Sequence, residues 1–136
     1  DLHRGWTFRR LEMALGNLRQ RTIAVLGLVY TPNTDTLRRS AAIELCGQLL
    51  AAGARVQAYD PALSVLPPEW QTIVLAKDLA GAVSNADAAV ICTEWPEFRQ
   101  ADWGALRSGM SGGLVIAREI FVVYRLALAL LLFAWF

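Results

Sequence analysis

The run TIAVLGL, at residues 22–28, is the most strand-like stretch in the chain, because it is apolar or β-branched apart from one glycine and carries no charge. Such a run is typical of a parallel strand that is covered on both faces. The turn-forming segment TPNTDT at residues 31–36 follows it, and an apolar helical pattern over residues 37–52 ends at Gly53. A second strand, RVQAY at residues 55–59, completes a strand–helix–strand unit.

A short amphipathic helix within residues 6–19 precedes this unit. After it, the same alternation of strands and helices continues. Further strands are expected at residues 72–75, 87–92 and 114–117, and helices at 78–84 and within 97–107, after a proline-rich loop at 61–70. The pattern predicts an α/β fold: an open, mostly parallel, doubly wound (Rossmann-like) sheet with helices on both faces. We divide the chain into a helical lead-in (1–20), one domain (21–121) and an apolar tail (122–136).

Composition excludes several classes of protein. A hydrophobic share of 55% in 136 residues is enough for one compact domain. Thirteen Lys and Arg against twelve Asp and Glu give a net charge of +1, so no nucleic-acid partner is expected. Two distant cysteines and a single histidine predict neither a metal site nor a disulfide framework, and they favour a reducing, cytoplasmic location. The first residue is not Met and no leader follows it, which indicates a fragment of a longer chain.

The end of the chain is strongly apolar. Residues 121–136, FVVYRLALALLLFAWF, contain one charge, Arg125, in a stretch shorter than the ~20 residues of a membrane span. Membrane association is therefore not expected. Three interpretations stay open: a helix buried against the sheet, a surface that joins two chains into a homo-oligomer, and a divergent or frame-shifted end.

Open α/β sheets bind ligands at the carboxyl ends of their strands, so the residues that follow each apolar run are the candidates for a site. These are the segments 27–30 and 93–95 together with Asp60 and Arg118. A dinucleotide-binding turn would show G-x-G-x-x-G, whereas Gly27 is followed by the bulky LVY. This argues against a standard nicotinamide or flavin pyrophosphate site after the first strand.

Each candidate residue has a functional and a structural interpretation. Asp60 can accept ribose hydroxyls or can end its strand in an Asp-Pro turn. Tyr30 can stack on a base or pack under a loop, and Arg118 can bind a phosphate or form a surface ion pair with Glu119 or Glu94. Cys46 and Cys92 lie in apolar patterns and are expected to be inert core residues, and nothing in the chain assembles a catalytic constellation.

Four blocks of the sequence carry a specific resemblance to a known family. They are TIAVLGLVYTPNTDTLRRS (22–40), GARVQAYDP (53–61), ADAAVICTEWPEF (86–98) and, more weakly, LVIAREIF (114–121). In this order and at this spacing, they resemble the C-terminal domain of UDP-glucose and GDP-mannose dehydrogenases, whose first block is roughly GLAFKPNTDDLRES and whose last is VVDGRNIF. The resemblance covers about residues 20–121.

The resemblance implies an NAD-dependent oxidation of the primary alcohol of a nucleotide sugar to a carboxylate. It also implies that Tyr30, Thr31 and Arg118 occupy the positions that contact the UDP-sugar, and that Arg38 lies on the NAD side. In the family, the NAD site and the catalytic cysteine precede this domain. We therefore expect no catalytic residue in this chain, NAD bound only through the missing N-terminal domain, and an isolated chain that is inactive.

Three departures from the family pattern bear on affinity. The family lysine is replaced by Thr31, which exchanges a charge-assisted contact for at most a hydroxyl hydrogen bond and costs on the order of one kcal/mol or more. Arg38 is followed by Arg39 where the family has an acid, and Arg118 lacks the acidic and glycine neighbours of the family motif. Two hypotheses result: a UDP-sugar-binding domain, or a non-catalytic, self-associating remnant with weak or no nucleotide binding. A standalone NAD-binding protein is disfavoured by Leu28 and Val29.

Overall fold

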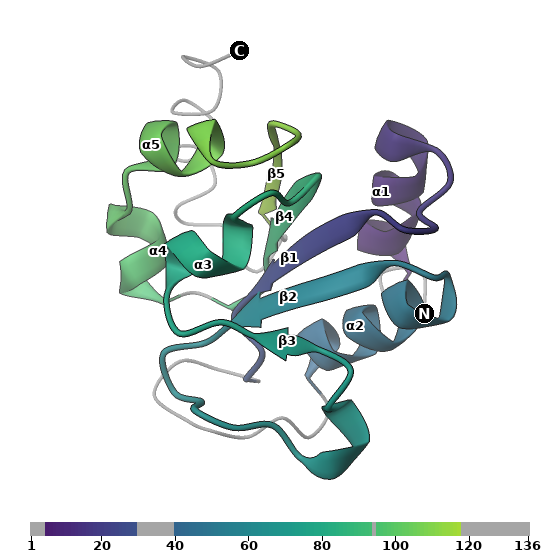
Figure 1. Ribbon diagram of the computed structural model, residues 1–136, viewed down its shortest axis with the longest axis horizontal. Helices are drawn as coiled ribbons and strands as arrows, with labels where there is room; N and C mark the ends of the chain where they lie inside the picture. Colours follow the sequence, from purple (N-terminus) through teal and green to yellow (C-terminus); the bar gives the residue numbers. More distant parts are fainter. Residues whose placement is uncertain (1–4, 30–39, 94, 118–136) are drawn as a thin grey trace.

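The computed structural model describes residues 5–29, 40–93 and 95–117. In chain order, the elements are α1 (Trp6–Leu15), β1 (Thr22–Leu26), α2 (Ala41–Ala51), β2 (Arg55–Tyr59), the 3-10 turn η1 (Pro68–Trp70), β3 (Val74–Leu75), α3 (Leu79–Val83), β4 (Ala88–Ile91), α4 (Pro96–Gln100), α5 (Trp103–Ser108) and β5 (Leu114–Ala117) (Figure 1). The expected strands at 55–59 and 114–117 have the predicted bounds, and the others begin or end within two residues of them.

The five strands form one sheet in the order β3-β2-β1-β4-β5, and every pairing is parallel. The chain therefore builds outward from β1 to β3 on one side and then returns to place β4 on the other side of β1. This reversal is the topological switch point of an open α/β sheet, which lies between the carboxyl ends of β1 and β4. The predicted doubly wound architecture is confirmed.

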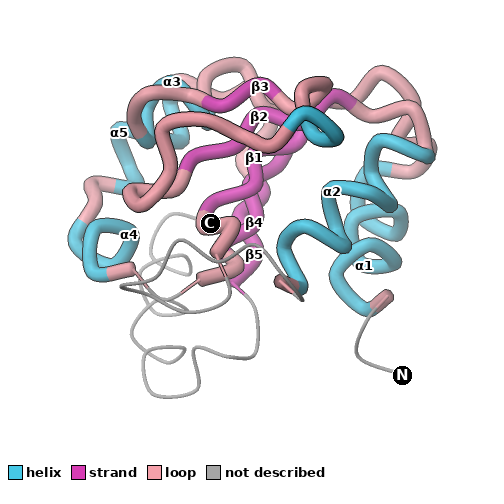
Figure 2. The backbone as a smooth tube through the Cα atoms, turned by 90° about the horizontal axis from the view of Figure 1, so that it is seen from below, coloured by secondary structure: helices cyan, strands magenta, loops and turns pink. Residues whose placement is uncertain are grey.

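Helices cover both faces of the sheet, as the sequence predicts. Figure 2 shows α1 and α2 on one side of the strands and α3, α4 and α5 on the other. Alternate residues of β1 enter two separate cores, with Ile23 and Val25 in the first and Ala24 and Leu26 in the second. All four are fully buried, which explains why this strand is a continuous apolar run rather than an alternating one.

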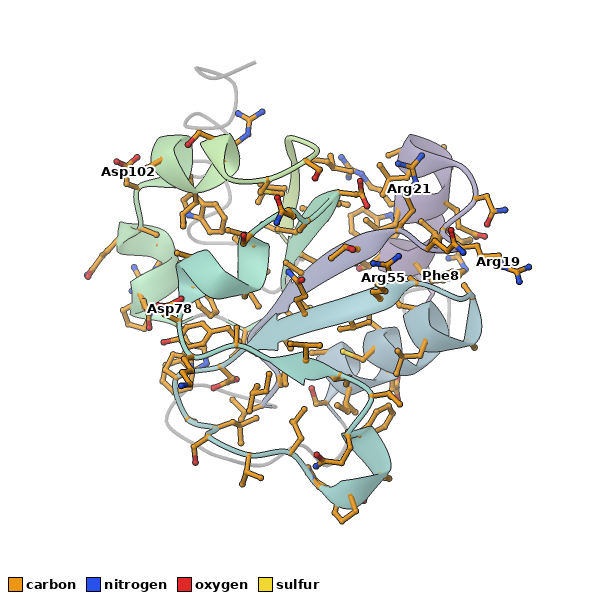
Figure 3. All side chains as sticks on the ribbon, in the orientation of Figure 1. Phe8, Arg19, Arg21, Arg55, Asp78 and Asp102 are labelled. Carbon is orange, nitrogen blue, oxygen red and sulfur yellow. The ribbon has the colours of Figure 1, made fainter. Side chains whose placement is uncertain are left out.

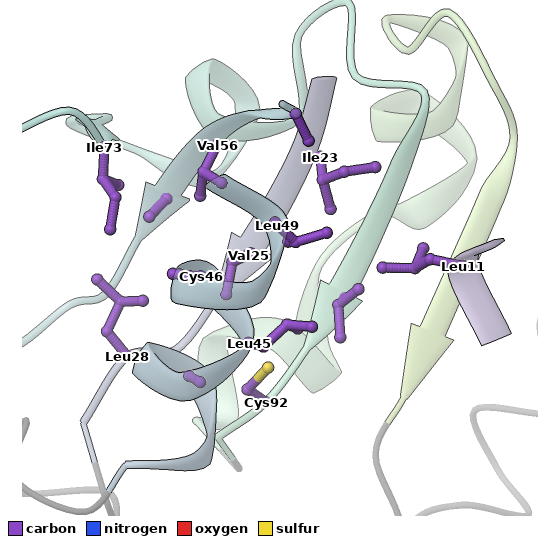
Figure 4. Close-up of a cluster of buried hydrophobic side chains, with 14 of the residues drawn as sticks. Leu11, Ile23, Val25, Leu28, Leu45, Cys46, Leu49, Val56, Ile73 and Cys92 are labelled. Carbon is purple, nitrogen blue, oxygen red and sulfur yellow. The ribbon is translucent and has the colours of Figure 1, made fainter. Parts of the chain in front are cut away.

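The first core lies between the sheet and helices α1 and α2 (Figure 4). Leu11 of α1 and Leu18 of the following turn belong to the same cluster as β1 and α2. The two cysteines also lie in this core, and both are buried, as the sequence predicts. Burial raises the pKa of the Cys46 thiol well above its ordinary range, which keeps this residue protonated and unreactive.

Two helix boundaries differ from the expectation. The helix predicted over residues 37–52 is described from Ala41, because the side chain of Ser40 accepts hydrogen bonds from the backbone N–H groups of Ala42 and Ile43 and so begins it. The helix expected within 97–107 is two helices, and the side chain of Asp102 caps the second by accepting from the Ala105 N–H. Within the described ranges, no helix has the length and apolar character needed to cross a membrane.

Candidate functional site

A network of buried hydrogen bonds ties together the chain segments that leave β1, β2 and β4 at the switch point. The sheet ladder ends with the Gly27 N–H donating to the Tyr59 carbonyl at 2.8 Å. Beyond that bond, the backbone groups of Leu28 and Val29 are satisfied by side chains from three other segments. We call Ser40, Asp60 and Thr93, the residues that provide these side chains, the strand-end clamp.

Asp60 follows β2 and is completely buried. One of its carboxylate oxygens, Oδ2, accepts the backbone N–H groups of Leu28 at 2.7 Å and Val29 at 3.0 Å. The other, Oδ1, accepts the Ala62 N–H at 2.8 Å and so closes the turn that ends the strand. The turn interpretation of Asp60 is therefore confirmed. The ribose interpretation is wrong, because both oxygens are used internally and the residue has no exposed surface.

Thr93 follows β4 and supplies the second part of the clamp. Its hydroxyl donates to the Val29 carbonyl at 2.8 Å, and the residue is 1% exposed. The two strand ends approach so closely that only glycine fits at residue 27. A Cβ on Gly27 would lie 2.6 Å from the Thr93 Cβ and 2.8 Å from its backbone nitrogen, and the φ of Gly27 is +86°.

Ser40, which precedes α2, supplies the third part of the clamp. Its hydroxyl donates to the Leu28 carbonyl, and the same oxygen caps α2. Both N–H groups and both carbonyls of Leu28 and Val29 thus have partners within the described residues. The sequence pattern singled out Asp60 and residue 93 as strand-end positions, but their role depends on partners 31–64 residues away and was not predictable from spacing.

The clamp shows why this turn is not a dinucleotide site. In a phosphate-binding turn, backbone N–H groups after the first strand point at the pyrophosphate. Here the Leu28 and Val29 N–H groups donate to the Asp60 carboxylate, and Thr93 packs against Gly27. Residues 27–29, the described residues after β1, therefore offer no free backbone donor to a pyrophosphate.

The residues predicted to contact ligand, Tyr30, Thr31, Arg38 and Arg118, all lie outside the described residues. The described residues that flank these segments all lie at the carboxyl edge of the sheet. Val29 precedes the segment 30–39, Ser40 follows it, and Ala117, the last residue of β5, precedes Arg118. The register pairs Leu26 with Ile91 and Ile91 with Ala117, so the end of β5 lies two strands, about 10 Å, from the end of β1.

Trp95 is a further polar group at this edge that sequence reasoning did not single out as a donor. Its indole nitrogen is buried and has no hydrogen-bond partner among the described residues. Trp95 lies two residues beyond Thr93 and packs against the second core. A buried donor without a partner is uncommon and identifies Trp95 as a residue to vary when a ligand is tested.

An open hollow of about 510 Å³ lies on the same side of the sheet as the second core, between α3, α4 and α5. Its polar lining comes from Glu97, Gln100 and Asp102, and the Glu97 carboxylate accepts the Tyr59 hydroxyl at 2.8 Å. Two carboxylates on the rim would repel a diphosphate. The hollow is therefore not a candidate for a nucleotide site.

Three arginines lie on the far side of the molecule from the hollow between α3, α4 and α5. Figure 3 shows the labelled Arg19, Arg21 and Arg55 on one side of the molecule and the labelled Asp78 and Asp102 on the other. Arg55 begins β2 and Arg21 immediately precedes β1, so both lie at the amino edge of the sheet, opposite the clamp. These arginines are too far from the strand ends to take part in a site there.

Comparison with known proteins gives one consistent result. Residues 24–121 match the model of the UDP-glucose/GDP-mannose dehydrogenase family, UDP binding domain. The chain is 43% identical over 107 residues to a UDP-glucose 6-dehydrogenase of Rhizobium meliloti, in an alignment that covers 78% of this chain and 24% of that protein. It is 44% identical over 105 residues to the UDP-glucose 6-dehydrogenase AglM of Haloferax volcanii, with coverages of 75% and 24%.

Solved structures agree with this result. A UDP-D-ManNAc dehydrogenase from Pyrococcus horikoshii superposes with a TM-score of 0.70 at 31% identity, covering 88% of this chain and 27% of that one. A UDP-glucose dehydrogenase from Pyrobaculum islandicum gives a TM-score of 0.70 at 30% identity, with coverages of 85% and 26%. The chain thus spans about a quarter of the length of the relatives that it matches.

Proposed function

The chain belongs to the UDP-glucose/GDP-mannose dehydrogenase family, of which it is the UDP-binding domain, and we propose that it binds a UDP-sugar at the carboxyl edge of its sheet. The observation that carries the proposal is the family match over residues 24–121, which includes all five described strands except the first two residues of β1. In the complete enzyme, the bound nucleotide sugar would be oxidised to a uronate with NAD as the hydride acceptor.

The strand-end geometry supports side chains, rather than backbone N–H groups, as the ligands of the diphosphate. The backbone donors after β1 are already used by Asp60. Arginine binds phosphate through two parallel N–H bonds, and Arg118 directly follows β5 in the sequence. The ends of β1 and β5 lie about 10 Å apart at the same edge of the sheet, so the segments that follow these two strands start from neighbouring positions.

NAD is assigned to the remainder of the enzyme. Its pyrophosphate finds neither free N–H groups nor an open glycine surface after β1. Arg38, which the family resemblance places on the NAD side, would then approach the cofactor from this domain without forming its main site. No cysteine at the carboxyl edge of the described sheet is exposed, since Cys92 is 5% exposed, so the nucleophile of the family reaction is likewise assigned elsewhere.

Titration calorimetry of the 136-residue chain tests the proposal. UDP and UDP-glucose should give saturable heat, and NAD at the same concentrations should give none. The Arg118→Ala variant should bind UDP at least about tenfold more weakly, because a charge-assisted phosphate contact contributes about 1.5–3 kcal/mol. Arg55→Ala is the matched control, since it removes the same side chain from the opposite edge of the sheet and should leave the affinity unchanged.

The Thr31→Lys variant tests the assignment in the opposite direction. It restores the charge that the family has at this position and should tighten UDP binding by about tenfold, equivalent to about 1.4 kcal/mol. Absence of heat with UDP at millimolar concentration, in both the natural chain and the Thr31→Lys variant, would refute the binding proposal. It would favour the non-catalytic, self-associating alternative, which size-exclusion chromatography with and without residues 122–136 can test.

A further inference from the structure

We propose that Ser40, Asp60 and Thr93, the strand-end clamp, are positioning residues of the nucleotide-sugar site. They do not touch the ligand. They fix the two described ends, Val29 and Ser40, of the chain segment 30–39. The inference rests on the proposed function, because that function assigns ligand contacts to Tyr30 and Thr31.

The first argument is where the clamp acts. The hydrogen-bond ladder of the sheet ends at Gly27, so the sheet itself does not hold residues 28 and 29. The clamp begins at that point and binds all four backbone polar groups of Leu28 and Val29. Tyr30 is joined to Val29 by one peptide bond. The orientation of the peptide plane between them therefore follows from the Val29 carbonyl, which the Thr93 hydroxyl holds.

The second argument is the origin of the three side chains. Asp60 comes from the end of β2, Thr93 from the end of β4, and Ser40 from the start of α2. A turn that only had to be stable could satisfy its own groups with short-range bonds or water. Here three side chains from separate segments, each at most 1% exposed, converge on the backbone of two consecutive residues. This arrangement fixes the direction in which the chain leaves β1.

The third argument is that the clamp couples the two strands of the switch point. Thr93 contacts Gly27 and bonds to Val29, so the ends of β1 and β4 cannot move independently. The described residue that precedes the proposed ligand residues, Val29, is thereby bonded to the chain that leaves β4. Catalytic and binding groups need placement to within about 0.5 Å, which a rigid clamp supplies and a solvated loop does not.

Thr93→Val tests the inference with the smallest change, since it replaces the hydroxyl with a methyl group of similar size and leaves the Val29 carbonyl without its donor. We expect the Kd for UDP, measured by calorimetry, to rise about tenfold. Thr93→Ser keeps the hydroxyl and should restore the affinity to within about twofold of the natural chain. Thr7→Val is the matched control, because Thr7 is also buried, at 4% exposure, but lies in α1. It should leave the Kd unchanged.

Ser40→Gly is the second variant and covers the case in which Thr93→Val does not fold. Glycine is an acceptable helix N-cap, so the start of α2 is retained, while the bond to the Leu28 carbonyl is lost. The Kd for UDP should again rise severalfold. All affinities are compared at a temperature at which the near-ultraviolet circular dichroism of each variant matches that of the natural chain, so that a loss of affinity does not report unfolding.

The outcomes separate the two proposals. If the natural chain binds no UDP, the proposed function is refuted and the positioning role falls with it. If the natural chain binds UDP and both Thr93→Val and Ser40→Gly bind it equally well, the positioning role is refuted and the proposed function stands. A loss of affinity in Thr7→Val as large as that in Thr93→Val would also refute the positioning role, because it would indicate a general effect of destabilisation.

Discussion

Replacing Gly27 by alanine should destabilise the domain strongly, and Gly53 provides a closely matched control. The φ angles of the two glycines are +86° and +87°, so alanine pays a similar backbone cost of about 1 kcal/mol at each. Their surroundings differ. A Cβ at Gly53 would meet the Cγ of Arg19 at 3.1 Å, which is part of an exposed and flexible side chain, whereas at Gly27 it would meet three Thr93 atoms at 2.6–2.8 Å.

The difference in the free energy of unfolding between Gly27→Ala and Gly53→Ala reports how closely the ends of β1 and β4 approach each other. Because one of the clashing atoms is the Thr93 backbone nitrogen, rotation of a side chain does not relieve the overlap, and overpacking of this kind costs about 1–3 kcal/mol. Gly27→Ala should therefore lower the free energy of unfolding by about 3 kcal/mol and Gly53→Ala by about 1 kcal/mol. For a domain of this size, these values correspond to decreases in Tm of roughly 12 °C and 4 °C.

Urea denaturation followed by tryptophan fluorescence gives both free energies, and a thermal melt followed by circular dichroism gives both Tm values. Equal destabilisation by the two substitutions would refute the reasoning. It would mean that the ends of β1 and β4 are not in contact at Gly27, and the coupling that the strand-end clamp provides would lose its structural basis. A thermal melt of Gly16→Ala adds a reference for a positive-φ glycine, at +76°, with no atom within 4 Å of the added Cβ.

Three further predictions concern other parts of the fold. Burial and the hydrogen bond to Glu97 raise the pKa of Tyr59 to about 12, so Glu97→Gln should move this pKa back toward 10. The pKa is read from the phenolate absorbance that disappears in Tyr59→Phe. Because the pKa is raised in the folded state, the contribution of Tyr59 to folding stability is complete below pH 10 and is lost as pH rises from 10 to 12. An unchanged pKa would contradict this. Trp103→Phe removes the hydrogen bond from the buried indole to the Phe98 carbonyl at 2.7 Å, together with part of a fully buried ring. It should lower the free energy of unfolding, measured in urea, by about 2–3 kcal/mol. A loss below about 1 kcal/mol would contradict this, because it would show that the surrounding side chains fill the cavity. Burial keeps the Cys46 thiol protonated, so its reaction with a disulfide reagent should be more than about 100-fold slower in native buffer than in denaturant. Similar reaction rates in the two buffers would mean that Cys46 is at the surface.

The strands were predictable because their patterns depend on local composition. A strand buried on both faces must be apolar at consecutive positions, and residues 23–26 and 88–91 satisfy this requirement. The edge strand β3 has only two residues, and Val74 is 62% exposed, so its pattern is weak and its predicted bounds were too long. Burial on both faces thus decides how well a strand can be located from sequence.

The helix boundaries that differ from the expectation are set by ordinary capping signals. Asp102 is a helix N-cap and Pro96 occupies the first turn of α4, and both are ordinary signals of a helix start. Their presence within residues 96–102 was sufficient to predict two helices instead of one. The start of α2 at Ser40 was signalled in the same way, by a serine followed by an apolar helical run.

The clamp could be predicted only in part, because its bonds join residues far apart in the sequence. The dipeptide Asp60-Pro61 indicates a turn, and that much is correct. Nothing local reveals that the same carboxylate accepts two N–H groups from a segment that precedes it by 31–32 residues. Such a bond requires the parallel pairing of β1 with β2, which is a property of the folded sheet.

The same bond explains how a Rossmann-like sheet can bind a nucleotide without a dinucleotide fingerprint. Two adjacent N–H groups that follow the first strand form an anion site in this fold, and that site must be satisfied by something. A glycine-rich turn leaves it for a ligand phosphate, whereas this chain satisfies it with the Asp60 carboxylate. A diphosphate placed at the same position would meet a buried negative charge and no free donor. The sequence GLVY after β1 therefore does more than lack two glycines. Together with Asp60, it leaves no free backbone donor at Leu28 and Val29, which is why the proposed phosphate contacts are assigned to side chains such as those of Thr31 and Arg118.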